Sequence, residues 1–366
     1  MKIERRNTAT RLFSDKQQHE DIMKSKRIAY YLRDCGNIHY FASIKPYLDY
    51  FFNQGVHENF LVVRGVSPAC RELGEYGGYT SLLTDNNDLD SYDLVITPTF
   101  LRPEERTGNT RAVQIFHGMS DKPFTYGRDF RGYIRCLCAG QRQVDRLRQN
   151  RVNRAARCTI IGYPKFDNSV KGPSLFNNDK KTVIYCPTWR KGNISSIDIF
   201  LDNPKIIQQL LANYNLLVKP HPNIFNPNRK FFKQDIIDRI RAIDGITLIR
   251  SGNVMPWFHQ ADLYIGDISA SGYEWLYFDR PMIFVNPQPD VLQPSIDPVS
   301  TTFLWQCGDV CNRIEELEAL IDTNLQADRF HKVREEVLHY SVYKPRGKGA
   351  TRRGIQQIEE ILATDH

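Results

Sequence analysis

The chain has 366 residues, 41% of them hydrophobic, and its 49 basic against 42 acidic residues give a formal net charge of +7. This length exceeds one ordinary hydrophobic core and predicts two domains, while the positive charge favours an anionic partner. No stretch approaches the roughly 18 uninterrupted apolar residues of a membrane-spanning helix, and the charged N-terminal residues lack the apolar segment of a secretory signal. We therefore expect a cytoplasmic protein whose membrane contact, if any, is peripheral and on the inner face.

Residues 1–25 are polar and charged and predict an N-terminal arm or a short helix. After this arm, short apolar runs alternate with helical patterns. The runs expected to form strands are residues 27–32, 59–65, 81–84, 92–98, 111–118, 134–140 and 158–164. A helix with an aromatic face is expected at 38–55 and a polar helix at 141–150. Strands that alternate with helices indicate a mainly parallel sheet, so residues 26–170 are expected to form a Rossmann-like domain.

The segment 168–181 has no periodicity and is rich in Asn, Lys, Gly and Pro, which favours a linker. A second alternation follows and predicts another Rossmann-like domain at 171–345. Its expected strands are residues 182–189, 215–222, 246–250, 261–267 and 281–287. Its expected helices are residues 204–213, 230–243, 272–278, 312–322 and 326–338. A last helix is expected within 346–366.

The predicted architecture is an α/β fold with two Rossmann-like domains facing across a cleft. A cleft between two such halves is the default ligand site. Many nucleotide-sugar transferases have this architecture, although a fold alone does not determine a function.

The eight cysteines are scattered and form no CxxC pair. Cys136 and Cys138 alternate within a predicted strand, and Cys307 and Cys311 lack a partnering pair at zinc-like spacing. Buried free thiols in a reducing compartment are therefore expected.

A histidine lies at the end of one predicted strand. His117 stands directly before Gly118, with Lys122 shortly after it. At this position an imidazole points over the edge of the sheet and can act as a general base near neutral pH. A turn histidine that bonds only to the backbone explains the same pattern, so both interpretations stay open.

Two further polar clusters follow strands of the second half. Lys219 and His221 lie in the sequence KPHP, where two prolines stiffen the turn. A stiff turn that presents an ammonium and an imidazolium suits a phosphate clamp. Thr188 and Arg190 flank Trp189 in CPTWR and are candidates for binding a phosphate or the acceptor. A core tryptophan beside a surface arginine is the alternative.

The stretch DLYIGDISASGYEW predicts a strand, a tight turn and a helix. In an α/β sheet such a turn lies at the carboxyl edge, where ligands bind. Its small residues and helix N-terminus suit a phosphate or diphosphate cradle around Ser269, Ser271 and Gly272. Glu274 can accept hydrogen bonds from ribose hydroxyls, or it only complements the helix dipole. An ordinary turn capped by Asp267 or Ser269 is the alternative to the cradle.

Nine arginines crowd one segment, opposed only by Asp129 and Asp145. They are Arg128, Arg131, Arg135, Arg142, Arg146, Arg148, Arg151, Arg154 and Arg157. A patch within 128–157 would hold an anionic membrane or a polyanionic acceptor, and a solvated helix face is the alternative. No aromatic interleaving and no nucleic-acid-binding motif accompanies it, so no nucleic-acid partner is expected.

Taken in order, five short motifs resemble the CDP-glycerol glycerophosphotransferase family, which includes teichoic-acid primases and polymerases and related capsule enzymes. They are HG-x-x-x-K at 117–122, GYPKFD at 162–167, PTWR at 187–190, KPHP at 219–222 and DIS-x-x-x-x-E…DRPMIFV at 267–285. The resemblance implies a GT-B fold, with the donor bound mainly by the C-terminal half and the acceptor by the N-terminal half. His117 matches the family's proposed catalytic base and His221 its donor-phosphate histidine. Asp267, Ser269 and Glu274 match its donor-binding turn.

The resemblance also implies the reaction. A polyol phosphate would pass from a CDP-activated donor to a hydroxyl of a lipid-linked or polymeric acceptor, with release of CMP, in teichoic-acid or capsule-like polymer synthesis. The family often has a second serine where this chain has Ala270, so CDP-ribitol stays open beside CDP-glycerol. No cofactor is required and no metal site is assigned, while Mg²⁺ stays open. The alternatives are a nucleotide-sugar glycosyltransferase, a UDP-sugar 2-epimerase-like enzyme and a non-catalytic polyanion-binding module.

Overall fold

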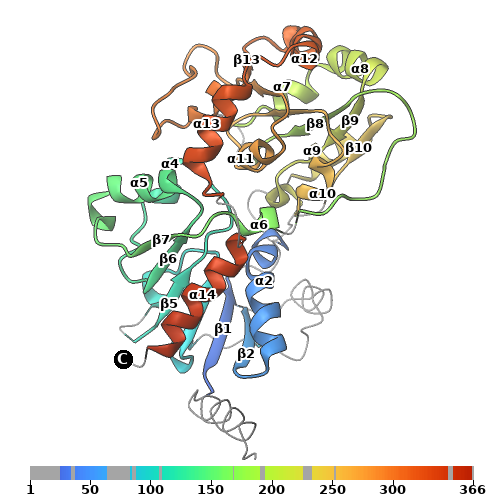
Figure 1. The fold of residues 1–366 in the computed structure, drawn as a ribbon. Helices are drawn as coiled ribbons and strands as arrows, with labels where there is room; N and C mark the ends of the chain where they lie inside the picture. Colours follow the sequence, from blue (N-terminus) through green and yellow to red (C-terminus); the bar gives the residue numbers. More distant parts are fainter. Residues whose placement is uncertain are drawn as a thin grey trace, which may run out of the picture.

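A computed structural model describes residues 25–33, 38–63, 83–84, 88–106, 109–167, 169–189, 194–225, 233–250, 253–344 and 349–364. Within these ranges the chain forms two α/β domains, with the N-terminal domain below the C-terminal domain in Figure 1. The predicted arm lies outside the described residues apart from Ser25, and the strand predicted at 81–84 is described only at Leu83–Thr84. None of the described helices is long and apolar enough to cross a membrane.

The sheet of the N-terminal domain has seven parallel strands among the described residues, in the order β3-β2-β1-β4-β5-β6-β7. They are β1 (Arg27–Leu32), β2 (Glu58–Val63), β3 (Leu83–Thr84), β4 (Leu94–Thr97), β5 (Ala112–Gln114), β6 (Arg135–Cys138) and β7 (Cys158–Ile160). Strand β4 is buried along its whole length, as a strand covered on both faces should be. The strand order reverses between β1 and β4, and such a switch point opens a crevice at the carboxyl ends of the strands.

The sheet of the C-terminal domain repeats this order with six parallel strands in the described part of the chain, β10-β9-β8-β11-β12-β13. They are β8 (Thr182–Cys186), β9 (Asn215–Val218), β10 (Ile246–Leu248), β11 (Leu263–Gly266), β12 (Met282–Val285) and β13 (Asp309–Cys311). Its switch point lies between β8 and β11, the strands that lead into the PTWR and DISASG segments. Both domains therefore have Rossmann-like strand order.

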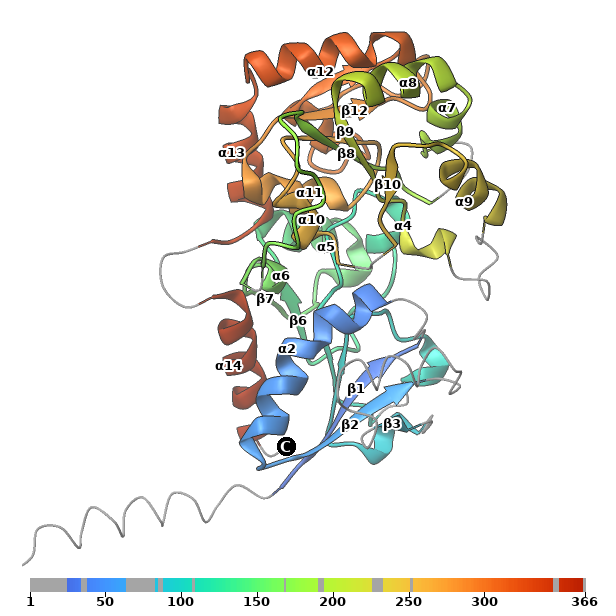
Figure 2. The ribbon, with the colours of Figure 1, turned by 90° about the vertical axis from the view of Figure 1, so that its right-hand side faces the viewer.

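Helices pack on both sheets, as Figures 1 and 2 show. Those of the N-terminal half are α2 (Ile38–Gln54), α4 (Pro123–Tyr126), α5 (Gln141–Gln149) and α6 (Pro164–Asp167). Those of the C-terminal half are α7 (Ile197–Leu201), α8 (Pro204–Asn213), α9 (Gln234–Arg241), α10 (Met255–Phe258), α11 (Ser271–Trp275), α12 (Leu317–Gln326) and α13 (His331–Ser341). Short 3₁₀ helices occur at Leu89–Ser91, Pro103–Glu105, Arg151–Asn153, Pro222–Ile224, Leu276–Phe278, Phe303–Cys307 and Ile314–Glu316. The helix predicted at 312–322 thus begins later, because a 3₁₀ turn precedes α12.

The last described helix, α14 (Ala350–Ala363), crosses back and lies beside α2 on the N-terminal domain (Figures 1 and 2). Its Ile355 joins Ile44 of α2 in one buried cluster. The two helices approach closely at Gly354, where a Cβ atom would lie 2.5 Å from the Tyr47 hydroxyl oxygen. The C-terminal helix that the sequence predicts is therefore part of the N-terminal core in space.

The cysteines within the described residues form no disulfide. Five are buried and Cys158 is half-buried. Burial raises the pKa of the Cys186 thiol to about 12, so this group stays protonated near neutral pH. The expectation of buried free thiols is confirmed for these residues.

Candidate active site

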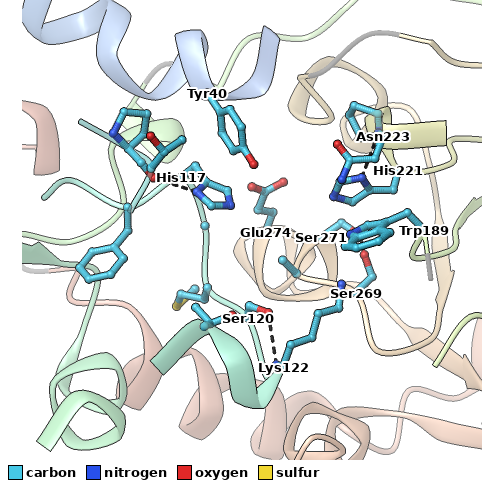
Figure 3. Close-up of a pocket in the computed structure, with 18 of the residues that line it drawn as sticks. Tyr40, His117, Ser120, Lys122, Trp189, His221, Asn223, Ser269, Ser271 and Glu274 are labelled. Carbon is cyan, nitrogen blue, oxygen red and sulfur yellow. Dashed lines mark hydrogen bonds between the residues drawn. The ribbon is translucent and has the colours of Figure 1, made fainter. Parts of the chain in front are cut away.

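A cavity of about 460 Å³ lies between the two domains, lined by residues that follow strands of both sheets. Of the site residues predicted from the sequence, those that line it are His117, Gly118, Lys122, Lys219, His221, Ser269, Ser271 and Glu274. Figure 3 shows His117 and His221 on opposite sides of this cavity. Thr188, Asp267 and Gly272 are buried without lining it, and Arg190 lies outside the described residues.

His117 follows β5 through a turn in which Phe116 has a left-handed backbone, with φ of 47°. A bulky residue adopts this conformation only where the surrounding structure imposes it. The turn brings His117 Nδ1 to 2.9 Å from the Pro98 carbonyl oxygen. Because a carbonyl oxygen only accepts hydrogen bonds, Nδ1 carries the ring proton and Nε2 keeps a lone pair. His117 is thus bonded to the backbone and lines the cavity, so the two sequence interpretations do not exclude each other.

The surroundings of His117 keep its ring neutral. Burial lowers its pKa to about 4, and the positive charges of Lys165 and Lys122 act in the same direction. The ring of Tyr40, on α2, meets the imidazole edge-on with 4.6 Å between the ring centroids. A neutral imidazole with a lone pair on Nε2 is the form that accepts a proton in general base catalysis.

His221 has the opposite tautomer. It follows β9 in the KPHP turn and caps the 3₁₀ helix at Pro222–Ile224. The backbone N–H of Asn223 donates to His221 Nδ1 over 3.1 Å. Since Nδ1 is the acceptor, the proton of the neutral ring lies on Nε2, which can donate to an anion. The ring of Trp189 lies beside it, with 5.9 Å between the centroids.

Two buried lysines add positive charge to the cavity wall. Lys122 and Lys219 are each 7% exposed. Lys122 belongs to the N-terminal domain, but its Nζ donates to Thr188 Oγ1 of the C-terminal domain over 2.7 Å. Burial lowers the pKa of Lys219, because the ammonium loses hydration there. A phosphate bound in the cavity would supply the charge partner that offsets this loss.

The turn after β11 places two serines in the wall and directs its aspartate inward. The Ser269 and Ser271 hydroxyl oxygens lie 2.9 Å apart. Asp267 is 1% exposed, and its carboxylate accepts hydrogen bonds from the backbone N–H groups of Thr188 and Ser196. In the structure this carboxylate holds the PTW segment against the turn, and the expected contact of Asp267 with the donor stays a prediction.

Thr188 and Gly272 also act from behind the wall. Thr188 is fully buried, and its hydroxyl oxygen accepts the hydrogen bond from Lys122. Gly272 lies inside α11, where a Cβ atom would be 2.5 Å from Leu304 Cδ2. The side chain of Thr188 and the Cα of Gly272 therefore support the wall from behind, and the expected contact of these residues with the donor stays a prediction.

A comparison with protein families decides the relationship that these motifs suggest. A family model described as CDP-Glycerol:Poly(glycerophosphate) glycerophosphotransferase matches residues 142–360, more than half of the chain. The chain belongs to this family. The teichoic acid glycerol-phosphate primase of Bacillus subtilis (strain 168) is a curated relative and is 30% identical to this chain over 105 residues. That match covers 29% of this chain and only 25% of the primase.

Solved structures share the fold of this family member. The wall teichoic acid polymerase TagF, soaked with CDPG, aligns with a TM-score of 0.59 at 16% identity, over 96% of this chain and 92% of that chain. A putative UDP-N-acetylglucosamine 2-epimerase from Listeria monocytogenes aligns with a TM-score of 0.57 at 10% identity, over 93% of this chain and 98% of that chain. These likenesses confirm the predicted α/β, GT-B-like fold.

In this glycerophosphotransferase family member, Glu274 ties the two domains together. Its Oε1 atom accepts hydrogen bonds from the Tyr163 hydroxyl at 2.6 Å and from the Lys165 ammonium at 2.7 Å. Figure 3 shows Glu274 between His117 and His221. The sequence alone predicts no role for Tyr163 or Lys165, because their partner lies 111 and 109 residues away in the chain. Their presence in the GYPKFD motif was the available signal.

A second buried cluster joins the domains around Asp121. The Tyr273 hydroxyl donates to both carboxylate oxygens of Asp121 over 2.8 Å. Arg142 and Arg146 of α5 form ion pairs with the same carboxylate. Burial raises the pKa of Asp121, while the two arginines oppose that shift. The interpretation of the arginine-rich segment as one solvated or lipid-facing surface is therefore wrong for Arg142 and Arg146, which are buried.

In the described part of the chain, no three His, Cys, Asp or Glu side chains gather as metal ligands would. The charges that face the cavity come instead from lysine, arginine and glutamate side chains.

Proposed function

We propose that this chain transfers glycerol phosphate from CDP-glycerol to a hydroxyl group of a polyol-phosphate acceptor and releases CMP. The family match supports this activity. The observation that carries it is the pair of histidines with opposite tautomers, His117 and His221, facing one cationic cavity. One presents a lone pair and the other an N–H group, and transfer of a phosphoryl group to a hydroxyl uses both.

In the proposed reaction, His117 Nε2 takes the proton of the acceptor hydroxyl as that oxygen attacks the β-phosphorus of CDP-glycerol. The bond from this phosphorus to the oxygen that bridges the two phosphates breaks, and CMP leaves with the bonding electrons. The Nε2–H group of His221 and the ammonium of Lys219 stabilise the charge that develops on CMP. The proton on His117 then passes to solvent. Exclusion of bulk water from the cavity suppresses hydrolysis of the donor.

We assign the donor to the C-terminal wall and the acceptor to the N-terminal wall. Ser269 and Ser271 are proposed to hold the donor diphosphate together with His221 and Lys219. Glu274 is proposed to bind the ribose through Oε2, because Oε1 is occupied by two donors from the other domain. Gly118 and Lys122 complete the phosphate contacts near the point of transfer. Neither Mg²⁺ nor a nucleic acid takes part in the reaction that we propose.

The test is release of CMP in the presence of a short poly(glycerol phosphate), with CDP-glycerol, CDP-ribitol and UDP-N-acetylglucosamine offered side by side. Turnover of CDP-glycerol above the other two supports the proposal. A preference for CDP-ribitol would support transfer of a polyol phosphate, but with CDP-ribitol as the donor in place of CDP-glycerol. Turnover of the UDP-sugar alone would favour the glycosyltransferase or epimerase alternative, and binding without turnover of any donor would favour the binding module.

Replacing His221 with alanine is expected to weaken CDP binding by about tenfold or more, because a hydrogen bond to a charged phosphate contributes about 1.5–3 kcal/mol. His221→Gln keeps an N–H donor of similar reach and should recover part of the affinity. The measurement is calorimetric titration with CDP. Unchanged affinity in His221→Ala would remove this residue from the donor site.

We further propose that the acceptor is lipid-linked and that the enzyme meets it at the inner face of the cell membrane. Arg148, Arg151 and Arg154 are exposed near Val152, which is 42% exposed, and their charge attracts anionic headgroups. Changing the three arginines to glutamine is expected to reduce sedimentation with phosphatidylglycerol vesicles at low salt. Arg313→Gln with Arg329→Gln, on the other domain, serves as the control. Equal sedimentation of both variants would contradict this surface.

A further inference from the structure

We propose that the N-terminal wall of the cavity contains a subsite for an acceptor that ends in a polyol phosphate, built by Arg128 and Gln114 beside an aromatic floor. The proposal rests on the proposed function, because it assigns the second substrate of the same cavity. Arg128 pairs with the acceptor phosphate, and Gln114 accepts a hydrogen bond from a polyol hydroxyl. A neutral sugar or a bare polyol would lack the first of these contacts.

The charge of the cavity indicates more than one anionic substrate. The positively charged lining residues are Arg33, Arg102, Lys122, Arg128, Lys165 and Lys219. Among the described lining residues Glu274 is the one carboxylate, and Lys165 pairs with it at 2.7 Å. A diphosphate donor at the C-terminal wall leaves Arg128 of the N-terminal wall without a negative partner, and a phosphate on the acceptor balances its charge.

Arg128 is the arginine of this wall that is available to a ligand. Arg33 pairs with Glu105 through two nitrogen atoms. Burial opposes the charge of Glu105, but hydrogen bonds from its partners, with Arg33 foremost, lower its pKa to about 2. Arg102 has an acidic partner at 3.5 Å. Arg128 is exposed, no carboxylate of the described residues lies in ion-pair distance of it, and its guanidinium lies 4.7 Å from the Phe100 ring centroid.

The loop that presents Arg128 is anchored on a buried asparagine. Asn153 Nδ2 donates to the Arg128 carbonyl oxygen over 2.7 Å, and Asn153 Oδ1 accepts from the Phe130 backbone N–H over 2.7 Å. The ring of Phe130 packs against Phe100 and Phe116, with centroid distances of 5.6 and 5.5 Å. These rings line the cavity and form an apolar floor for the carbon chain of a polyol. The backbone that presents Arg128 is therefore held in place before any ligand arrives, which reduces the ordering cost of binding.

Gln114 supplies an independent sign of a ligand. It is the last residue of β5, is 2% exposed and lines the cavity. Its Oε1 atom is buried and has no hydrogen-bond partner in the described structure. Buried acceptor atoms of this kind rarely lack a hydrogen-bond partner, so we expect a ligand to donate a hydrogen bond to Gln114 Oε1. A hydroxyl of the acceptor polyol fits, because His117, which takes the proton of the reacting hydroxyl, follows three residues later.

The first test is binding of a synthetic glycerol phosphate trimer to the full chain without donor, by calorimetry. Arg128→Gln is expected to raise the Kd about tenfold or more, because a hydrogen bond from a guanidinium to a phosphate is lost. Arg131→Gln is the matched control: Arg131 lies three residues away, is exposed and pairs with Asp129. The difference between the variants should narrow at high salt. Equal affinity of both variants for the trimer would overturn the subsite.

The second test separates the subsite from the proposed reaction. With CDP-glycerol as donor, Arg128→Gln and Gln114→Leu are each expected to raise the KM for the trimer and to leave the affinity for CDP unchanged. If the wild-type chain releases no CMP although trimer binding depends on Arg128, the subsite stands and the proposed function fails. If turnover proceeds with an unchanged acceptor KM in both variants, the function stands and the subsite is wrong.

Discussion

Alanine in place of His117 is expected to lower turnover with CDP-glycerol by at least about 10², the lower end of what a positioned general base contributes. Affinity for CDP should stay near the wild-type value, because the proposed donor contacts lie on the C-terminal wall. Steady-state kinetics and CDP titration measure the two effects. Turnover at the wild-type level in the variant would end the assignment of His117 as the base.

A histidine elsewhere in the fold controls for general damage. His259 Nε2 lies 2.9 Å from the Ser169 hydroxyl oxygen, and His259 does not line the cavity. His259→Ala should therefore keep its turnover. A loss of similar size in both variants would mean that unfolding, and not loss of the base, explains the His117 result.

The pH profile of the wild-type chain checks the same assignment. Burial lowers the pKa of His117 to about 4, so in the free protein the base stays unprotonated above that pH. As the pH is lowered from neutral, kcat/KM should therefore stay constant at first and decrease only when the pH approaches about 4. The negative charge of bound donor raises the pKa of a nearby imidazole, so kcat should fall at a higher pH than kcat/KM. An acid limb of kcat/KM at the ordinary histidine value of about 6.5 would contradict this environment.

Replacing Asp121 with alanine is expected to reduce the free energy of unfolding by about 3–5 kcal/mol. The side chains of Asp121 and Arg142 are 5% and 2% exposed, and Arg146 shares the same carboxylate. Removing the carboxylate leaves two buried guanidinium groups without their counter-charge and also frees the Tyr273 hydroxyl. Urea unfolding followed by circular dichroism measures the change.

Asp129 provides the matched comparison for Asp121. It pairs with Arg131 at 2.9 Å, but the side chains of Arg131 and Asp129 are 57% and 38% exposed. Asp129→Ala should therefore cost at most about 1 kcal/mol. Similar losses in the two variants would show that the buried cluster contributes no more than a surface ion pair does. Tyr273→Phe, which keeps the carboxylate and both arginines, should fall between them.

The fold could be predicted because strands of parallel sheets are buried on both faces. The runs LVIT in β4 and LYIG in β11 are apolar and buried throughout, and their alternation with helical patterns leaves few arrangements. Helix ends were less predictable. The helix expected at 230–243 already ends at Arg241, since hydrophobic spacing continues into residues that have left the helix, and residues 230–232 lie outside the described part of the chain.

The candidate site could be predicted only in part, because a motif shows which residues reach a sheet edge and not where each side chain turns. Asp267 and Ser269 are two residues apart, yet the carboxylate faces the interior and the hydroxyl lines the cavity. Arg142 and Arg148 share one helix, but one is buried against Asp121 and the other is exposed. The direction of a side chain depends on partners elsewhere in the chain, such as Thr188 for Asp267 and Asp121 for Arg142, which a single sequence does not reveal.

The return of α14 to the N-terminal domain has a consequence for synthesis on the ribosome. Ile355 and Ile358 belong to the buried cluster that also contains Ile44, but they are translated after the whole C-terminal domain. Domains generally fold in the order in which they emerge, N-terminal first. Here the C-terminal domain can complete its own core earlier, while the first domain waits with the apolar face of α2 uncovered. A nascent chain that ends before α14 therefore exposes that face, which makes it a target for chaperones until translation passes this helix.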